Sequence, residues 1–133
     1  MSEENVQIVR HVLEAFNSED IEPMLAFAHA DLEVEIPPEV STEPDTYRGH
    51  DGMRRYFESF WDAMEGIQFE AEQLWDAGEA VVVALRLTAR GRQTAIAVEQ
   101  RSAGVWEICD GKVIRIRAYP SIARALAAVG LAE

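Results

Sequence analysis

A tight turn between two strand-like segments near the end of the chain constrains the fold most. Asp110 and Gly111 separate residues 106–109 from residues 112–119, and both flanking segments are rich in β-branched and aromatic side chains. A type I′ hairpin turn needs positive φ at both central residues, and Asp-Gly adopts it readily. Residues 121–131 then read as a short alanine-rich helix that ends at Gly130. The pattern predicts an antiparallel hairpin followed by a helix.

Apolar residues at helical spacing predict three helices before the main sheet. Their expected ranges are residues 2–17, 21–29 and 51–64. Asp51 is expected to be the N-cap of the third helix. Residues 32–36 alternate between apolar and acidic side chains and predict a short strand, whereas residues 37–50 hold three prolines and several acids and predict a loop. Four further strands are expected to begin near Ile67, Glu79, Gln93 and Lys112.

Length and charge limit the class of protein and of partner. At 133 residues the chain is expected to form one domain, residues 1–133. A formal net charge of −12 disfavours nucleic acid and anionic membranes as partners. Cys109 is the single cysteine, and no stretch of signal-peptide or membrane-spanning character is visible, so we expect a cytoplasmic location. No residue spacing indicates a metal site or a phosphate-binding loop, so neither a metal nor a cofactor is predicted.

Four local stretches, together with the order of the elements, carry a family resemblance. They are residues 16–21, 31–35, 47–53 and 105–131. The first resembles a break between two helices, the second a first strand, the third a tight helix entry, and the last a closing hairpin and helix. These features resemble the SnoaL-like branch of the NTF2-like superfamily, which has the ketosteroid isomerase-like fold. The resemblance implies an α+β protein in which a cone-shaped, curved antiparallel sheet and three N-terminal helices enclose a pocket.

Positions that carry catalytic groups in related enzymes hold other residues in this chain. The resemblance to ketosteroid isomerases puts Ile36 at the position of the general base and Val12 at the position of a tyrosine on the first helix. Their second oxyanion donor falls on Gln100 or Gly104, depending on the alignment. The resemblance to limonene-epoxide hydrolases puts Ala118 at an acid position. Because acid–base catalysis needs a positioned proton donor or acceptor, we expect no steroid isomerase activity.

Strand alternation sorts the side chains that can line a pocket. Gln100 and Trp106 share one face of their strand. Alternation leaves open which face of the strand from Glu79 is inside, and the family alignment favours the face of Arg86. An inward arginine would need a carboxylate or a ligand anion as its partner, because an unpaired charge is costly in apolar surroundings. The predicted ligand-binding residues are Phe16, Phe57, Trp61, Arg86, Gln100 and Trp106.

The leading hypothesis is a SnoaL-like protein that binds a small, largely apolar molecule in the pocket of the cone. One alternative is an enzyme of the isomerase, polyketide cyclase or epoxide hydrolase type that uses acid–base chemistry in the pocket. Another alternative is a dimeric interaction module whose pocket is filled by Trp61 and Trp106. Three helices suffice to cover only one face of the sheet, so we also expect a homodimer formed through the outer face.

Overall fold

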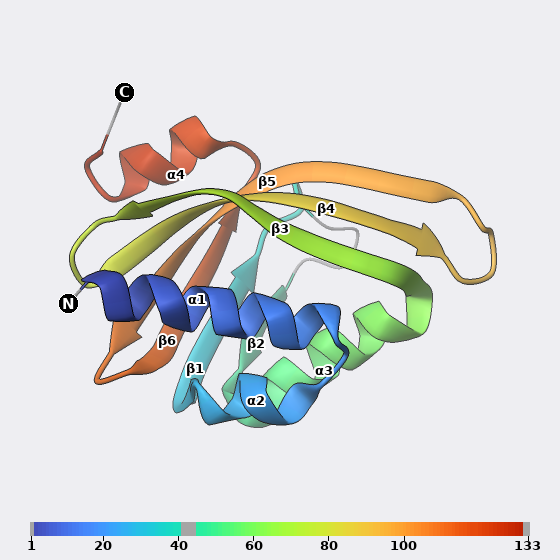
Figure 1. Cartoon of the computed structure of the whole chain (residues 1–133), viewed down its shortest axis with the longest axis horizontal. Helices are drawn as coiled ribbons and strands as arrows, with labels where there is room; N and C mark the ends of the chain where they lie inside the picture. Colours follow the sequence, from blue (N-terminus) through green and yellow to red (C-terminus); the bar gives the residue numbers. More distant parts are fainter. Residues whose placement is uncertain (1, 41–44, 132–133) are drawn as a thin grey trace.

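A curved six-stranded sheet organises the chain (Figure 1). The computed structural model describes residues 2–40 and 45–131. Four strands follow one another as antiparallel neighbours, namely β3 (Met64–Asp76), β4 (Ala80–Gly91), β5 (Ala97–Cys109) and β6 (Lys112–Tyr119). β1 (Ala28–Ile36) runs parallel to β6 and antiparallel to β2 (Asp45–Arg48). The order is therefore β2-β1-β6-β5-β4-β3, and the sheet is mixed rather than purely antiparallel.

Helices lie on both faces of this sheet. α1 (Ser2–Asn17), α2 (Ile21–Ala26) and α3 (Gly49–Ala63) lie on the concave side, and α4 (Ile122–Ala128) lies on the other side (Figure 1). α1 packs mainly on β3 and α3 mainly on β1, so the two long helices cover opposite margins of the sheet. The predicted α+β architecture with three N-terminal helices is confirmed. In the described part of the chain, no helix is long and apolar enough to span a membrane.

The closing hairpin and the closing helix are also confirmed. Asp110 and Gly111 both have positive φ, at 53° and 78°, as a type I′ turn requires. The Ser121 hydroxyl accepts a hydrogen bond from the Arg124 backbone N–H at the start of α4. Gly130 follows the end of α4 with a φ of 78°, a conformation that favours glycine. The turn fixes the register between β5 and β6, on which the lining of the concave face depends.

The second helix and the predicted loop are both shorter than expected. α2 ends at Ala26, because Ala28 already begins β1 and lies opposite Val113 of β6. The predicted loop contains β2, in which the buried Tyr47 lies opposite the buried Val34 of β1. A strand of four residues is too short for alternation to reveal it in the sequence. Its position is set by pairing with β1 instead.

The starts of α3 and β5 also differ from the prediction. α3 begins at Gly49, so Asp51 lies inside the first turn and the predicted N-cap is wrong. Its negative charge still suits the N-terminal end of the helix. β5 begins at Ala97 rather than near Gln93, because a turn first follows β4. This shift leaves the faces of the later β5 residues unchanged.

α4 covers part of the outer face of the sheet. Its buried residues Ala125 and Leu126 pack on Val82 of β4 and on Ala103 and Val105 of β5. These residues form an apolar cluster distinct from the main core. The expectation that the helices leave the whole outer face free is therefore wrong over this cluster.

The last residue of α1 is hydrogen-bonded to the edge strand β3. Asn17 Nδ2 donates to the Phe69 carbonyl oxygen over 3.0 Å, and Asn17 Oδ1 accepts from the Phe69 backbone N–H over 2.7 Å. An edge strand has no neighbour for one side of its backbone. The Asn17 amide takes the place of that neighbour at one residue, and it fixes the end of α1 on β3.

Replacing Asn17 by alanine is expected to lower the free energy of unfolding by about 1–3 kcal/mol, because two half-buried backbone groups of Phe69 lose their partner. Urea denaturation measures the change. Gln7→Ala is the matched control on the same helix, since the exposed Gln7 side chain donates a hydrogen bond to the exposed Glu3 one turn away. It should change the free energy by less than about 0.5 kcal/mol. Equal effects of the two substitutions would contradict the role given to Asn17.

Candidate functional site

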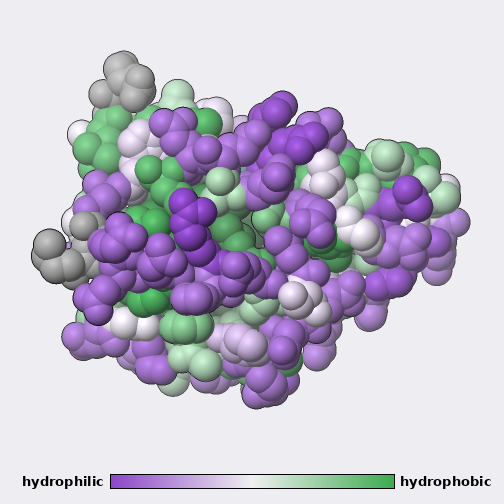
Figure 2. Space-filling view, viewed as in Figure 1, coloured by the Kyte–Doolittle hydropathy of each residue, from purple (hydrophilic) through white to green (hydrophobic). Residues whose placement is uncertain are grey.

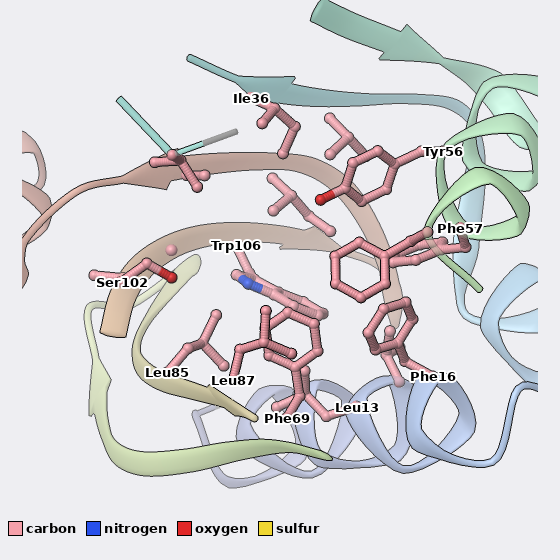
Figure 3. A pocket seen from close by; sticks show the side chains of 18 of the residues that line it. Leu13, Phe16, Ile36, Tyr56, Phe57, Phe69, Leu85, Leu87, Ser102 and Trp106 are labelled. Atoms are coloured by element: carbon pink, nitrogen blue, oxygen red, sulfur yellow. The ribbon is translucent and has the colours of Figure 1, made fainter. Parts of the chain in front are cut away.

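A cavity of about 120 Å³ lies between the concave face of the sheet and helices α1 and α3 (Figure 3). Its helical walls are Val12, Leu13 and Phe16 of α1, Met24 of α2, and Tyr56, Phe57 and Phe60 of α3. β1, β3, β4, β5 and β6 form the remaining walls, together with Val40 after β1. On the outside, Figure 2 shows a mainly hydrophilic surface with a recess in which apolar residues are visible. The predicted pocket therefore exists in this fold.

The lining is apolar except for four uncharged polar side chains. They are Tyr56, Gln100, Ser102 and Trp106. Among the residues that the structure describes, the lining contains no Asp, Glu, His, Lys, Arg or Cys. Within the same ranges, no three His, Cys, Asp or Glu side chains are grouped so that they could hold a metal ion. The cavity can donate and accept hydrogen bonds, but these residues give it no charge.

Gln100 connects β5 with the segment that follows β1. Its Nε2 donates to the Val40 carbonyl oxygen over 2.9 Å. Both residues line the cavity, and they are 60 positions apart in the sequence. The bond uses the donor end of the amide, so the amide oxygen remains an acceptor. Gln100 thus positions one wall and leaves one polar atom for a ligand.

Tyr56 brings a buried phenol to the cavity. Figure 3 shows its hydroxyl directed into the space from α3, and the Ser102 hydroxyl directed into it from β5. Burial, and to a smaller extent the neighbouring Tyr47, raises the pKa of Tyr56 to about 12. The Tyr56 hydroxyl is therefore neutral at physiological pH, where it can donate or accept a hydrogen bond.

Four of the predicted ligand-binding residues line the cavity. They are Phe16, Phe57, Gln100 and Trp106. Trp61 does not line it, and this prediction needs correction. Its ring lies 5.7 Å from Phe16 and 6.1 Å from Phe57, measured between ring centroids, so it packs within the aromatic cluster. Helical spacing identified the apolar face of α3, but it could not separate residues at the cavity from residues in the cluster.

Arg86 lies on the outer face of β4, and its predicted inward orientation is wrong. Leu85 and Leu87 line the cavity, so the residue between them points the other way. Arg86 Nε donates to Glu99 Oε2 over 2.8 Å, and Arg86 Nη1 donates to Glu70 Oε1 over 3.1 Å. β3 and β5 bring these two carboxylates to the same side as Arg86. The guanidinium therefore has protein partners and cannot reach a ligand in the cavity.

The positions compared with catalytic groups of related enzymes do face the cavity. Val12, Ile36 and Ala118 line it, and so do both candidates for the second oxyanion donor, Gln100 and Gly104. No carboxylate stands at any of these positions. Enolate chemistry requires a base close to the reacting carbon, and these positions supply none.

The sequence reasoning missed two polar residues of the cavity. Tyr56 and Ser102 both line the cavity, and neither was among the predicted ligand-binding residues. A tyrosine within an otherwise apolar helical face was the available signal, because a buried phenol usually needs a hydrogen-bond partner.

A family model for the SnoaL-like domain matches residues 9–116. A search of curated proteins finds no match. Among solved structures, an NTF2-like protein from Burkholderia xenovorans LB400 is 28% identical, with 97% of each chain covered and a TM-score of 0.75.

Two further structures hold small molecules. TerC, co-crystallised with polyporic acid, is 19% identical over 95% of this chain and 98% of its own, with a TM-score of 0.78. A protein of ketosteroid isomerase-like fold from Catenulispora acidiphila DSM 44928, in complex with trimethylamine, is 14% identical over 93% of this chain and 92% of its own, with a TM-score of 0.76. At these identities the likeness concerns the fold alone.

Arg86→Met is expected to lower the unfolding temperature slightly at neutral pH, because Glu70 loses its partner and Glu99 keeps only the longer contact with Arg101 among the described residues. The hydrogen bond from Arg86, together with its positive charge, holds the pKa of Glu99 below its ordinary value. The stabilisation is therefore present above the unfolded-state pKa and is lost as the pH falls through the folded-state pKa.

Thermal unfolding of the wild-type protein and of Arg86→Met at neutral pH, at about pH 3 and in about 1 M salt measures the contribution of the Arg86 ion pairs. The difference in unfolding temperature should shrink in acid and in salt. Arg54→Met is the control, since the ion pair of Arg54 with Glu22 is longer, at 3.6 Å, and more exposed. A difference that is constant across these conditions would contradict the pairing.

Proposed function

The chain belongs to the SnoaL-like domain family, and we propose that it binds a small, neutral, largely apolar molecule in the cavity between the sheet and helices α1 and α3. The observation that carries this proposal is the composition of the lining. Apolar side chains form most of the described walls, and a few uncharged polar groups interrupt them. This combination is typical of small-molecule sites, where apolar walls supply affinity and a few polar groups supply orientation.

The size of the cavity limits the ligand. A cavity of about 120 Å³ is close to the roughly 150 Å³ of an engineered apolar cavity that binds benzene. A compact molecule with one ring matches this space without rearrangement of the walls. Trp106 forms one wall and Trp61 lies within the aromatic cluster, so the two tryptophans leave the cavity open rather than filled. This arrangement favours binding over an interaction module with a filled pocket.

The lining favours binding over catalysis as well. An isomerase, cyclase or hydrolase needs an acid or a base beside the reacting atoms. The described walls hold no carboxylate and no imidazole, and the one titrating group, Tyr56, has a pKa of about 12. The relatives that hold trimethylamine and polyporic acid support a small organic ligand for this fold.

Ala118→Leu is expected to weaken the binding of a small neutral probe such as toluene at least about tenfold, because the larger side chain occupies the space that the ligand needs. Isothermal titration calorimetry on both proteins measures the change. Ala123→Leu adds the same groups on the exposed side of α4 and should leave the affinity unchanged. Unchanged affinity in Ala118→Leu would place the probe elsewhere, and no binding of toluene to the wild-type protein would contradict the proposal.

We also propose a homodimer that forms through the ion-pair strip, the part of the outer face that α4 does not cover. The strip consists of Glu70, Glu72, Arg86, Glu99 and Arg101 on β3, β4 and β5. Acidic and basic side chains alternate along the strip. In a dimer with two-fold symmetry, the acidic residues of one copy can therefore face the basic residues of the other. Arginine is also enriched at protein interfaces.

Light scattering at micromolar concentration is expected to give the mass of two chains. Arg101→Glu should shift the mass toward one chain, because it adds a carboxylate beside Glu72 and Glu99. Arg54→Glu on α3 reverses a charge away from the strip and should leave the dimer intact. A single-chain mass for the wild-type protein would contradict the dimer.

A further inference from the structure

We propose that Tyr56 anchors the polar group of the ligand, by donating a hydrogen bond from its hydroxyl to a neutral oxygen such as that of a ketone or an alcohol. This inference rests on the proposed function and deepens it, because it defines the class of ligand. The bound molecule would be a compact apolar body that carries one neutral acceptor oxygen near α3.

The Tyr56 hydroxyl has no protein partner among the described residues. It is directed into the cavity (Figure 3). Buried hydroxyl groups normally form at least one hydrogen bond, and an unmade bond is unfavourable. A ligand oxygen in the cavity would supply the missing partner. The same hydroxyl next to a purely apolar ligand would stay unsatisfied.

The ring of Tyr56 is held in place, so its hydroxyl has a defined position. Its centroid lies 4.8 Å from that of Tyr47 and 4.9 Å from that of Phe57. The guanidinium of Arg55 lies over the Tyr47 ring at 4.4 Å. A side chain packed between two rings loses little further freedom when a ligand binds, which favours a specific hydrogen bond.

The other polar groups agree with a neutral acceptor on the ligand. Ser102 and Trp106 can both donate a hydrogen bond, whereas the amide nitrogen of Gln100 is already bonded to Val40. An anionic ligand would find no cation among the described lining residues. The pKa of about 12 keeps Tyr56 protonated, so its donor is available at every physiological pH.

The test compares two probes of nearly the same shape, cyclohexanone and methylenecyclohexane, which differ by an acceptor oxygen. Calorimetric titrations are made with the wild-type protein, with Tyr56→Phe and with Tyr119→Phe. Tyr119 lies on the outer side of β6 beside the α4 cluster and does not line the cavity, so it is the matched control. Tyr56→Phe is expected to weaken the binding of cyclohexanone about three- to tenfold, because the hydrogen bond is lost. It should change the affinity for methylenecyclohexane less than about twofold. Tyr119→Phe should change neither.

Thermal unfolding without ligand separates the anchor from a structural role. Because the hydroxyl has no protein partner among the described residues, Tyr56→Phe should not lower the unfolding temperature. A clear fall would assign the hydroxyl to the fold and overturn the proposal.

The outcomes for the two proposals differ. If both probes bind the wild-type protein and Tyr56→Phe leaves cyclohexanone unchanged, the anchor is wrong and the binding function stands. If neither probe binds, the binding function fails and the anchor fails with it. If cyclohexanecarboxylate binds more tightly than cyclohexanone, the proposal that the ligand is neutral is overturned.

Discussion

The cavity depends on α1 being fixed to the edge of the sheet rather than packed on its middle. The Asn17 side chain makes two hydrogen bonds with the backbone of Phe69 on β3. Phe16 and Phe69 both line the cavity, and their ring centroids are 4.8 Å apart. One polar contact therefore sets the distance between two apolar walls. At the opposite margin α3 rests on β1, so the middle strands curve beneath a space that neither helix fills.

Strand alternation then separates charge from the cavity. Arg86 pairs with Glu70 and Glu99 on the outer face, and Arg115 Nε donates to Glu35 Oε2 over 2.8 Å on the same side. Exposed ion pairs of this kind add little stability. Their larger consequence is that the charges of the central strands lie outside, while the described lining stays neutral. With a net charge of −12, the surface also disfavours the approach of anions.

The sequence predicted the elements with strong local signals and missed what depends on contacts between distant segments. The Asp110-Gly111 turn needs only its own backbone geometry, so it could be read directly. β2 exists because Tyr47 pairs with Val34, and no local pattern indicates such a pairing. The face of Arg86 was misjudged for the same reason. Its position is fixed by carboxylates on two neighbouring strands, and the single-strand pattern of β4 fits either face.

The positions that the family resemblance associates with catalytic groups carry uncharged side chains in this chain. Ile36 and Ala118 line the cavity where the family comparison places acids, and both are apolar. A carboxylate placed at Ile36 would enter a cavity whose described walls carry no charge, and burial there would raise its pKa, so that less of it would be ionised at neutral pH. Tyr56, neutral and held by its neighbours, can orient a bound oxygen but has no base to receive a proton from the bound molecule. For the ligand proposed above, selectivity would come from the fit to the apolar walls and from hydrogen bonds with uncharged groups such as Tyr56, Gln100 and Ser102.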